Sequence, residues 1–233
     1  MNENSAKIYS YLMTLFVVML VLTNIIGTKI FVIFEESLPN GLFGFPLALT
    51  AGIITYPITF LVTDVTSEIF GKKKASLLVV AGFFCSLLSL LIITIVIELN
   101  PSQAWLSGSP YDNIEKMVEA FNAVFSLPGV LITASMTAYL VAQLIDIRIF
   151  HLVKKITNSK YLWLRNNFST MCSQLVDTVI VNTIFLGFGM NLDTATIIQI
   201  IICNYLVKII IAAIDTPLVY LAVFYIKKHI INS

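Results

Sequence analysis

The sequence carries little charge for its length. Asp, Glu, Lys and Arg make up 12% of its 233 residues, whereas roughly 25% is typical of soluble domains. Hydrophobic residues make up 58% and fall into long blocks. The net charge of +1 gives no sign of a nucleic-acid partner. This composition excludes an ordinary soluble domain and favours membrane-crossing segments, each of which needs about 20 mostly apolar residues.

Residues that carry enzyme or metal chemistry are also scarce. The chain has two histidines, His151 and His229, and three cysteines without a CxxC spacing. Each cysteine lies in an apolar block and is interpreted as a small apolar residue. The sequence contains no metalloprotease, nucleophile-elbow or phosphate-loop motif. We therefore expect no enzyme activity, no metal site and no cofactor, so any transport is passive, ion-coupled or driven by another subunit.

The apolar blocks predict an all-α integral membrane protein with six transmembrane helices in a single domain, residues 1–233. The first block contains Asn24 and Lys29, and the second ends in TDVTSEIFGKKK, where the three lysines are interpreted as a linker. The predicted spans are 8–34, 46–69, 76–97, 129–151, 168–190 and 195–226.

The basic residues predict the orientation of the spans. They gather after the second and fourth blocks and at both chain ends, whereas the alternate loops are mostly acidic. Cytoplasmic loops of membrane proteins carry an excess of Lys and Arg. Both termini are therefore predicted to be cytoplasmic, on the side of Lys7, Lys72, Lys73, Lys74, Lys154, Lys155, Lys160, Arg165, Lys227 and Lys228.

A short amphipathic helix is predicted at residues 114–127, before the fourth span. Ile114, Met117, Val118, Phe121 and Phe125 repeat at helical spacing, and the intervening positions are polar. Such a helix fits the outer membrane surface. Its role is either a surface cap, which we favour, or a lid over a binding site.

Small residues form a stripe in the fourth block. Ala134, Ala138 and Ala142 are spaced by four, which lets helices approach closely. The stripe packs either within one chain or between the two chains of a homodimer.

Polar residues inside four of the blocks recur at helical spacing, which places them on stripes. Polar groups in hydrocarbon need partners or a wet cavity, so we expect these stripes to converge on one interior site. The stripes are Tyr56, Phe60, Asp64 and Glu68; Tyr139, Gln143 and Asp146; Thr170, Gln174 and Asp177; and Asn204, Lys208 and Asp215.

Structural roles compete with functional ones at several of these positions. Lys208, the only base clearly at mid-depth, is expected to neutralise one of the acids. Asp146 is equally explained by a helix end that reaches the interface, and Glu68 by a pair with Lys72 one turn on. The candidate substrate-binding residues are Asp177, Gln174, Asp146, Gln143, Lys208, Asn204, Asp64, Glu68, Tyr139 and Asn24.

Four segments together resemble the vitamin uptake transporter family, also called the queuosine precursor transporter family. They are PITFLVTDVTSEIFGKKKA at 57–75, ASMTAYLVAQLIDIRIF at 134–150, LWLRNNFSTMCSQLVDTVI at 162–180 and KIIIAAIDTPLVYL at 208–221. The resemblance runs from Asn24 to about Leu221 and includes the unit Gln-x-x-Asp twice. It implies a six-helix protein of the bacterial cytoplasmic membrane that imports 7-deazaguanine bases, such as the cyano and aminomethyl precursors or queuine, for tRNA modification.

A small nucleobase substrate would make chemical sense of the polar stripes. Its N–H edge suits a carboxylate, Asp177 or Asp146, and its carbonyl suits a donor, Gln174 or Gln143. Tyr139, Tyr56 or Phe60 would stack on the ring, and Asp64 or Glu68 would pair with an ammonium arm.

Two other classes of function stay open from the sequence. One is a substrate-binding membrane subunit of a multi-component importer, which needs a separate energising complex. The other is a membrane scaffold that transports nothing.

Overall fold

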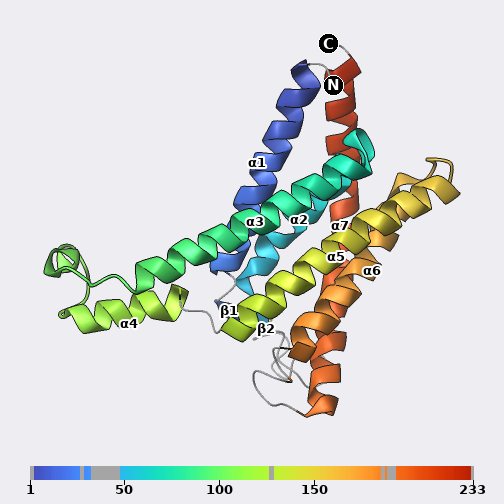
Figure 1. Ribbon diagram of the computed structural model, residues 1–233. Coiled ribbons are helices and arrows are strands. Elements are labelled where there is room, and N and C mark those ends of the chain that lie inside the picture. The colour runs from blue at the N-terminus through green and yellow to red at the C-terminus, as the bar shows by residue number, and fades with distance from the viewer. Residues whose placement is uncertain are drawn as a thin grey trace.

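A computed structural model of the protein (Figure 1) describes residues 3–26, 29–32, 48–125, 129–184, 187 and 193–231. The described chain is almost entirely helical. Its α-helices are α1 (Glu3–Ile26), α2 (Tyr56–Phe70), α3 (Lys72–Ile97), α4 (Ile114–Phe125), α5 (Gly129–Ile156), α6 (Leu162–Asn182) and α7 (Thr194–Ile231). Two short 3-10 helices, η1 (Ala51–Ile54) and η2 (Gln103–Leu106), precede α2 and α4.

The long helices form a bundle around α2, which contacts α1, α3, α5 and α7. α6 lies along α5 on one side and α7 on the other. The start of α1 and the end of α7 lie side by side at the same end of the bundle (Figure 1). Because α2 is surrounded, its polar side chains must find partners inside the protein.

Among the described residues, five helices are long and apolar enough to cross a membrane: α1, η1 with α2, α3, the part of α5 from Ser135, and α7. The fifth predicted span corresponds to α6, which begins earlier than expected, at Leu162 rather than 168, and is more polar than the others. Its buried residues include Arg165, Asn166, Gln174 and Asp177. The part of the predicted span beyond 184 lies almost wholly outside the described residues.

A small sheet replaces the end of the first predicted span. α1 ends at Ile26, and β1 (Ile30–Val32) pairs antiparallel with β2 (Ala48–Thr50). The Lys29 carbonyl accepts a hydrogen bond from the Ala51 amide (2.8 Å). The expectation of one helix over 8–34 was therefore wrong at its end, where β-branched and aromatic residues favour a strand.

The lysines expected to form a linker after α2 belong to a helix instead. The linker is Gly71 alone, with φ 81°, a backbone angle that glycine adopts without steric cost. α3 then begins at Lys72, so Lys72 to Lys74 form its first turn. Because the turn is so tight, α3 begins at the end of the bundle where α2 ends, and the two helices pack as neighbours.

The amphipathic helix before the fourth span is confirmed as α4. It packs on α3 and on η2, and the Trp105 ring of η2 meets the Phe121 ring at 5.5 Å between centroids. Phe121 in turn contacts Phe125 (4.6 Å). This position is away from the bundle centre, which favours a cap over a lid.

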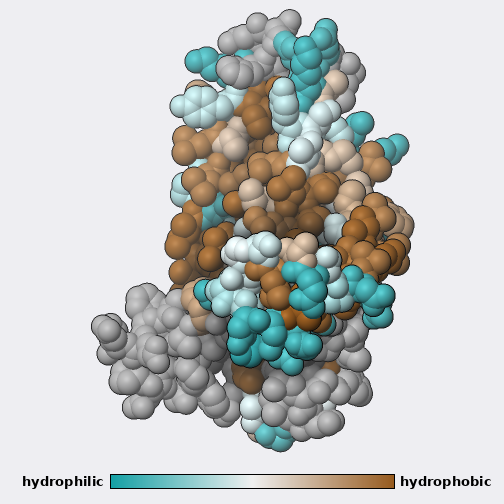
Figure 2. Space-filling model, turned by 90° about the vertical axis from the view of Figure 1, so that its left-hand side faces the viewer, coloured by the Kyte–Doolittle hydropathy of each residue, from teal (hydrophilic) through white to brown (hydrophobic). Residues whose placement is uncertain are grey.

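The hydrophobic core lies between α1, α2, α3 and α5. Phe16 and Leu20 of α1 pack there against Leu78 and Tyr139. α1 approaches α3 closely at Gly82, where an added Cβ would lie 2.5 Å from the Phe16 ring. The larger hydrophobic residues on the outer faces of α3 and α7 are exposed. Figure 2 shows a broad hydrophobic band across one face of the molecule. Such a band suits contact with lipid.

At Ala138 and Ala142 the alanine stripe packs inside the chain, whereas the Ala134 side chain lies outside the described ones. Ala138 and Ala142 are completely buried, on a helix that contacts α2, α3 and α6. The small side chains therefore bring α5 close to its own neighbours, and at these two positions no alanine surface is left for a second chain.

Candidate functional site

A cavity lies between α2, α6 and α7, near the middle of the bundle. Its enclosed volume is about 30 Å³, well below that of a typical ligand pocket. Three of the four predicted polar stripes contribute to its wall. The lining residues are Ile53, Tyr56, Pro57, Phe60, Thr170, Gln174, Lys208, Ile211, Ala212 and Asp215.

An ion pair and two aromatic rings form one part of the wall. Lys208 Nζ lies 2.7 Å from Asp177 Oδ2 and 5.3 Å from the centre of the Tyr56 ring. The Tyr56 and Phe60 rings are 5.1 Å apart and tilted by 59°. The expectation that Lys208 neutralises an interior acid is confirmed, and the acid is Asp177. Such a wall offers a flat ligand both aromatic surface and charge.

Two further cavity side chains have hydrogen-bonding capacity to spare. Gln174 is 4% exposed and Thr170 is 6% exposed. Within the ranges described, neither the Gln174 Oε1 atom nor the Thr170 hydroxyl has a hydrogen-bond partner. A buried polar group left unpaired costs about 1–3 kcal/mol. A ligand with matching polar atoms would recover that energy.

Asp215 adds an acid to the cavity that sequence reasoning placed on a stripe but did not select. Its side chain is mostly buried and lines the cavity. No Lys or Arg of the described chain forms an ion pair with it, because Lys208 is bound to Asp177. The signal for Asp215 was its spacing of seven residues from Lys208, which returns to the same helix face.

Asp64 and Asp146 lie behind the cavity wall. Both are completely buried, and neither lines the cavity. Ser173 of α6 donates a hydrogen bond to Asp146 Oδ1 (3.1 Å). Asp146 is thus an interior residue of the bundle, and its position excludes the alternative of a helix end that reaches the interface.

Glu68, one turn beyond Asp64 on α2, belongs to an ion cluster and not to the cavity. Its carboxylate lies 2.7 Å from Lys154, 2.6 Å from Arg165 and 3.1 Å from Lys227. These contacts join α2, α5, α6 and α7. The alternative of a structural ion pair is confirmed for Glu68, but its partners are not Lys72, which starts a different helix after the Gly71 turn.

The remaining candidates are dispersed. Tyr139 belongs to the hydrophobic core, with its ring 6.5 Å from that of Phe16, and Gln143 is completely buried. Asn204 is half-buried one turn before Lys208. Asn24 lines a different pocket between α1, α3 and α4. The structure therefore brings Gln174 and Lys208 together in the cavity, with Asp177 bound to Lys208 at its edge.

The comparisons with known proteins agree on one family. The family model described as "Putative vitamin uptake transporter" matches residues 50–222. A protein named "Probable queuosine precursor transporter" from Bacillus subtilis is 29% identical over 81% of this chain and 76% of its own length. The "Queuosine precursor transporter" of Escherichia coli is 25% identical over 76% of this chain and 73% of its own length. No solved structure matches the chain.

Proposed function

Because the chain belongs to the vitamin uptake transporter family, we propose that it imports a queuosine precursor, a 7-deazaguanine base, across the bacterial cytoplasmic membrane. The names of its relatives and its apolar helices support this function. In the proposal α6 also crosses the membrane, as the fifth of six spans in chain order. Its polar side chains are tolerated in the membrane because α5 and α7 cover them.

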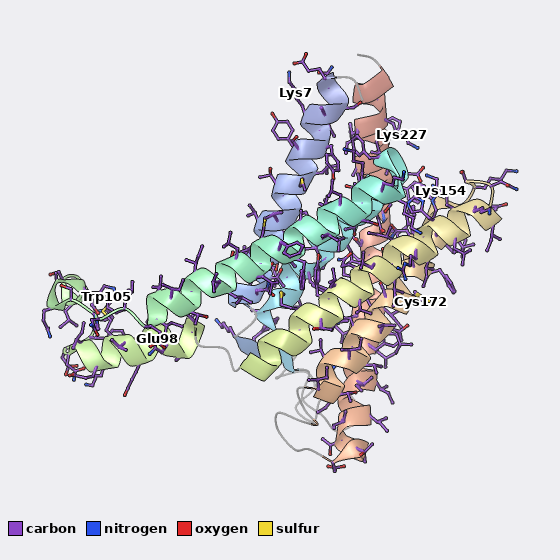
Figure 3. The ribbon with its side chains drawn as sticks, in the orientation of Figure 1. Lys7, Glu98, Trp105, Lys154, Cys172 and Lys227 are labelled. Carbon is purple, nitrogen blue, oxygen red and sulfur yellow. The ribbon has the colours of Figure 1, made fainter. Side chains whose placement is uncertain are left out.

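Both termini are proposed to lie in the cytoplasm. Lys7, Lys154 and Lys227 gather toward the end of the bundle that holds the chain termini, whereas Glu98 and Trp105 lie far from it, beside α4 (Figure 3). The basic end corresponds to the cytoplasmic side by the excess of Lys and Arg there. α4 then lies at the outer surface.

The observation that carries the proposal is the composition of the cavity wall. An aromatic pair, an ion pair and the Gln174 carboxamide, whose oxygen has no hydrogen-bond partner in the described chain, surround one small space. Tyr56 and Phe60 supply a surface on which a flat base stacks. Lys208 and Gln174 donate to its carbonyl oxygen, and Asp177 accepts from its N–H edge.

Asp215 is proposed to face the 7-substituent of the base. A carboxylate without a protein cation suits a protonated aminomethyl group, which would form a charge-assisted hydrogen bond. This role replaces the sequence-based choice of Glu68, which already has three cations, and of Asp64, which lies behind the wall.

The test is direct binding of ligands to the purified, full-length protein in detergent. We expect saturable binding of 7-cyano- and 7-aminomethyl-7-deazaguanine. Gln174→Ala should weaken both about tenfold, equivalent to about 1.4 kcal/mol. Asn182→Ala is the matched control, because this carboxamide lies on α6 and is already bonded to the Thr178 carbonyl (2.7 Å). Absence of binding by the parent protein, or equal affinities in all three proteins, would contradict the proposed site.

A further inference from the structure

Two carboxyl groups meet in the interior of the bundle, behind the cavity. Asp64 of α2 and Asp146 of α5 are completely buried, and their carboxyl groups are close enough to interact electrostatically. Ser173 donates to Oδ1 of Asp146. Among the residues with described side chains, none donates a hydrogen bond to Oδ2 of Asp146 or to either oxygen of Asp64.

The interior cations are already committed to other acids. Lys208 is bound to Asp177, and Arg165 is bound to Glu68. Two carboxylates in contact repel each other, and burial removes the water that would hydrate them. The stable form of such a pair holds at least one proton, and the protonated carboxyl donates to the other.

The neighbouring titratable groups favour this protonated form. Asp215 of α7 interacts with Asp64, and Asp146 interacts with the Cys172 thiol of α6. α1 and α3 pack on the other side of α2 mainly through the hydrophobic core. The groups around the pair therefore bring negative charge or no charge.

The pair lies between the cavity and the basic end of the bundle. Thr170 lines the cavity, and its hydroxyl is close enough to both carboxyl groups to interact with them. On the other side, the next turn of α2 carries Glu68, which forms ion pairs with three cations. A proton in the cavity thus reaches Asp64 and Asp146 past Thr170, while the ion cluster separates them from the basic end.

We propose that Asp64 and Asp146 are a proton-binding pair that couples transport to proton entry, an inference that rests on the proposed function. A carboxylate oxygen of the pair takes a proton from hydronium in the cavity and leaves water, so the pair becomes neutral. The neutral pair permits the change of access state, because net charge in hydrocarbon is expensive. When the basic end opens, the O–H bond breaks and the proton passes to water there.

The experiment uses the full chain in proteoliposomes with labelled 7-aminomethyl-7-deazaguanine. Accumulation is measured with and without an acidic exterior, at a clamped membrane potential, and a trapped dye reports internal pH. Counterflow, the exchange of labelled for unlabelled substrate without a gradient, measures transport that needs no coupling. The proteins are the parent, Asp64→Asn, Asp146→Asn and the exposed control Asp112→Asn, whose carboxylate pairs only with Lys116 in the described chain.

We expect the acidic exterior to raise accumulation by the parent and by Asp112→Asn at least fivefold, with substrate-dependent acidification inside. Asp64→Asn and Asp146→Asn should keep counterflow and lose both effects. If one of the two fails to fold, the other carries the comparison. Parent uptake that ignores the pH gradient, or a gradient response that survives in both variants, would overturn the proposal.

A second measurement separates the pair from the identity of the substrate. The infrared spectrum of the purified parent at neutral pH should contain a protonated carboxylic-acid band that Asp146→Asn lacks. An absent band in a protein that transports the base overturns the pair. A band without any transport of the base overturns the proposed function and its coupling, but supports the shared proton.

Discussion

Two acidic residues one helical turn apart on α2, Glu68 and Asp64, differ in how their charge is compensated. At Glu68 a single acid has three cations from three other helices. At Asp64 two acids meet without any cation in the described part of the protein. Acidic residues on the same helix face thus serve two purposes. The Glu68 cluster joins helices, whereas in our proposal the Asp64–Asp146 pair is neutralised by a proton.

The difference follows from the side chains that the neighbouring helices place beside Glu68 and beside Asp64. α5, α6 and α7 all bring a base to the end of the bundle, where Lys227 is 48% exposed and Lys154 24%. Deeper in the bundle, α6 brings uncharged groups, such as the hydroxyl of Ser173. The Asp177–Lys208 pair is the balanced case, with one acid and one base.

The largest expected effect comes from removing the acid of the compensated cluster. Glu68→Gln should destabilise the protein by about 3–5 kcal/mol, because it leaves a buried guanidinium without its partner. That guanidinium belongs to Arg165, which is only 2% exposed. Thermal unfolding of the purified protein in detergent measures the loss. The control is Lys227→Gln, which removes a half-exposed cation and should cost less than about 1 kcal/mol. Equal losses in the two variants would show that the cluster does not hold the helices together.

The balanced pair tests whether Asp177 has a role beyond neutralising Lys208. Asp177→Leu should destabilise by about 2–3 kcal/mol, because it leaves a cation in the membrane interior. Adding Lys208→Met should restore most of the stability. Binding of the deazaguanine should not return in the double variant, since both groups contact the base in our proposal. Recovery of binding together with stability would reduce Asp177 to a counter-ion.

The uncompensated acid of the cavity is tested by ligand preference. Asp215→Asn should weaken binding of the aminomethyl base about tenfold, or about 1.4 kcal/mol, because the ammonium loses its carboxylate. The cyano base carries no such charge, so its affinity should change less than about twofold, or about 0.4 kcal/mol. Competition between the two bases gives the ratio directly, and an unchanged ratio would remove Asp215 from the site.

The smallest expected effect on stability comes from the acid pair. Asp64→Asn should change the free energy of unfolding by less than about 1 kcal/mol, because the amide replaces a protonated carboxyl as donor to Asp146. The same unfolding assay compares it with Glu68→Gln. A loss as large as that of Glu68→Gln would mean that Asp64 is a fully paired ion, and the contrast between the two levels of α2 would disappear.

Helical periodicity was sufficient to find most of the cavity. The spacing of Thr170 and Gln174, and of Lys208 and Asp215, placed each pair on one face, and the structure puts all four in the same wall. The α4 helix was likewise found from its apolar positions. These predictions depend only on the pitch of one helix.

Predictions that required neighbours were less secure. The stripe of Tyr139 and Gln143 shares the spacing of the other three, yet it faces the core and not the cavity. Asn24 lies in a different pocket. A stripe shows that residues share a face, but the packing of α5 against α1, α2 and α3 decides where that face points.

The sequence by itself determined that long apolar helices carry polar faces, because about 20 apolar residues and a 3.6-residue period are local properties. It also placed most Lys and Arg residues in alternate loops and at the chain ends, and therefore predicted them on one side of the membrane. Only the tertiary structure decided which charges meet. Glu68 and Lys227 are separated by 159 residues in sequence, and Asp64 and Asp146 come from different helices. Since a buried charge is stabilised or left uncompensated by partners within a few ångströms, its role depends on helix packing that no single segment encodes.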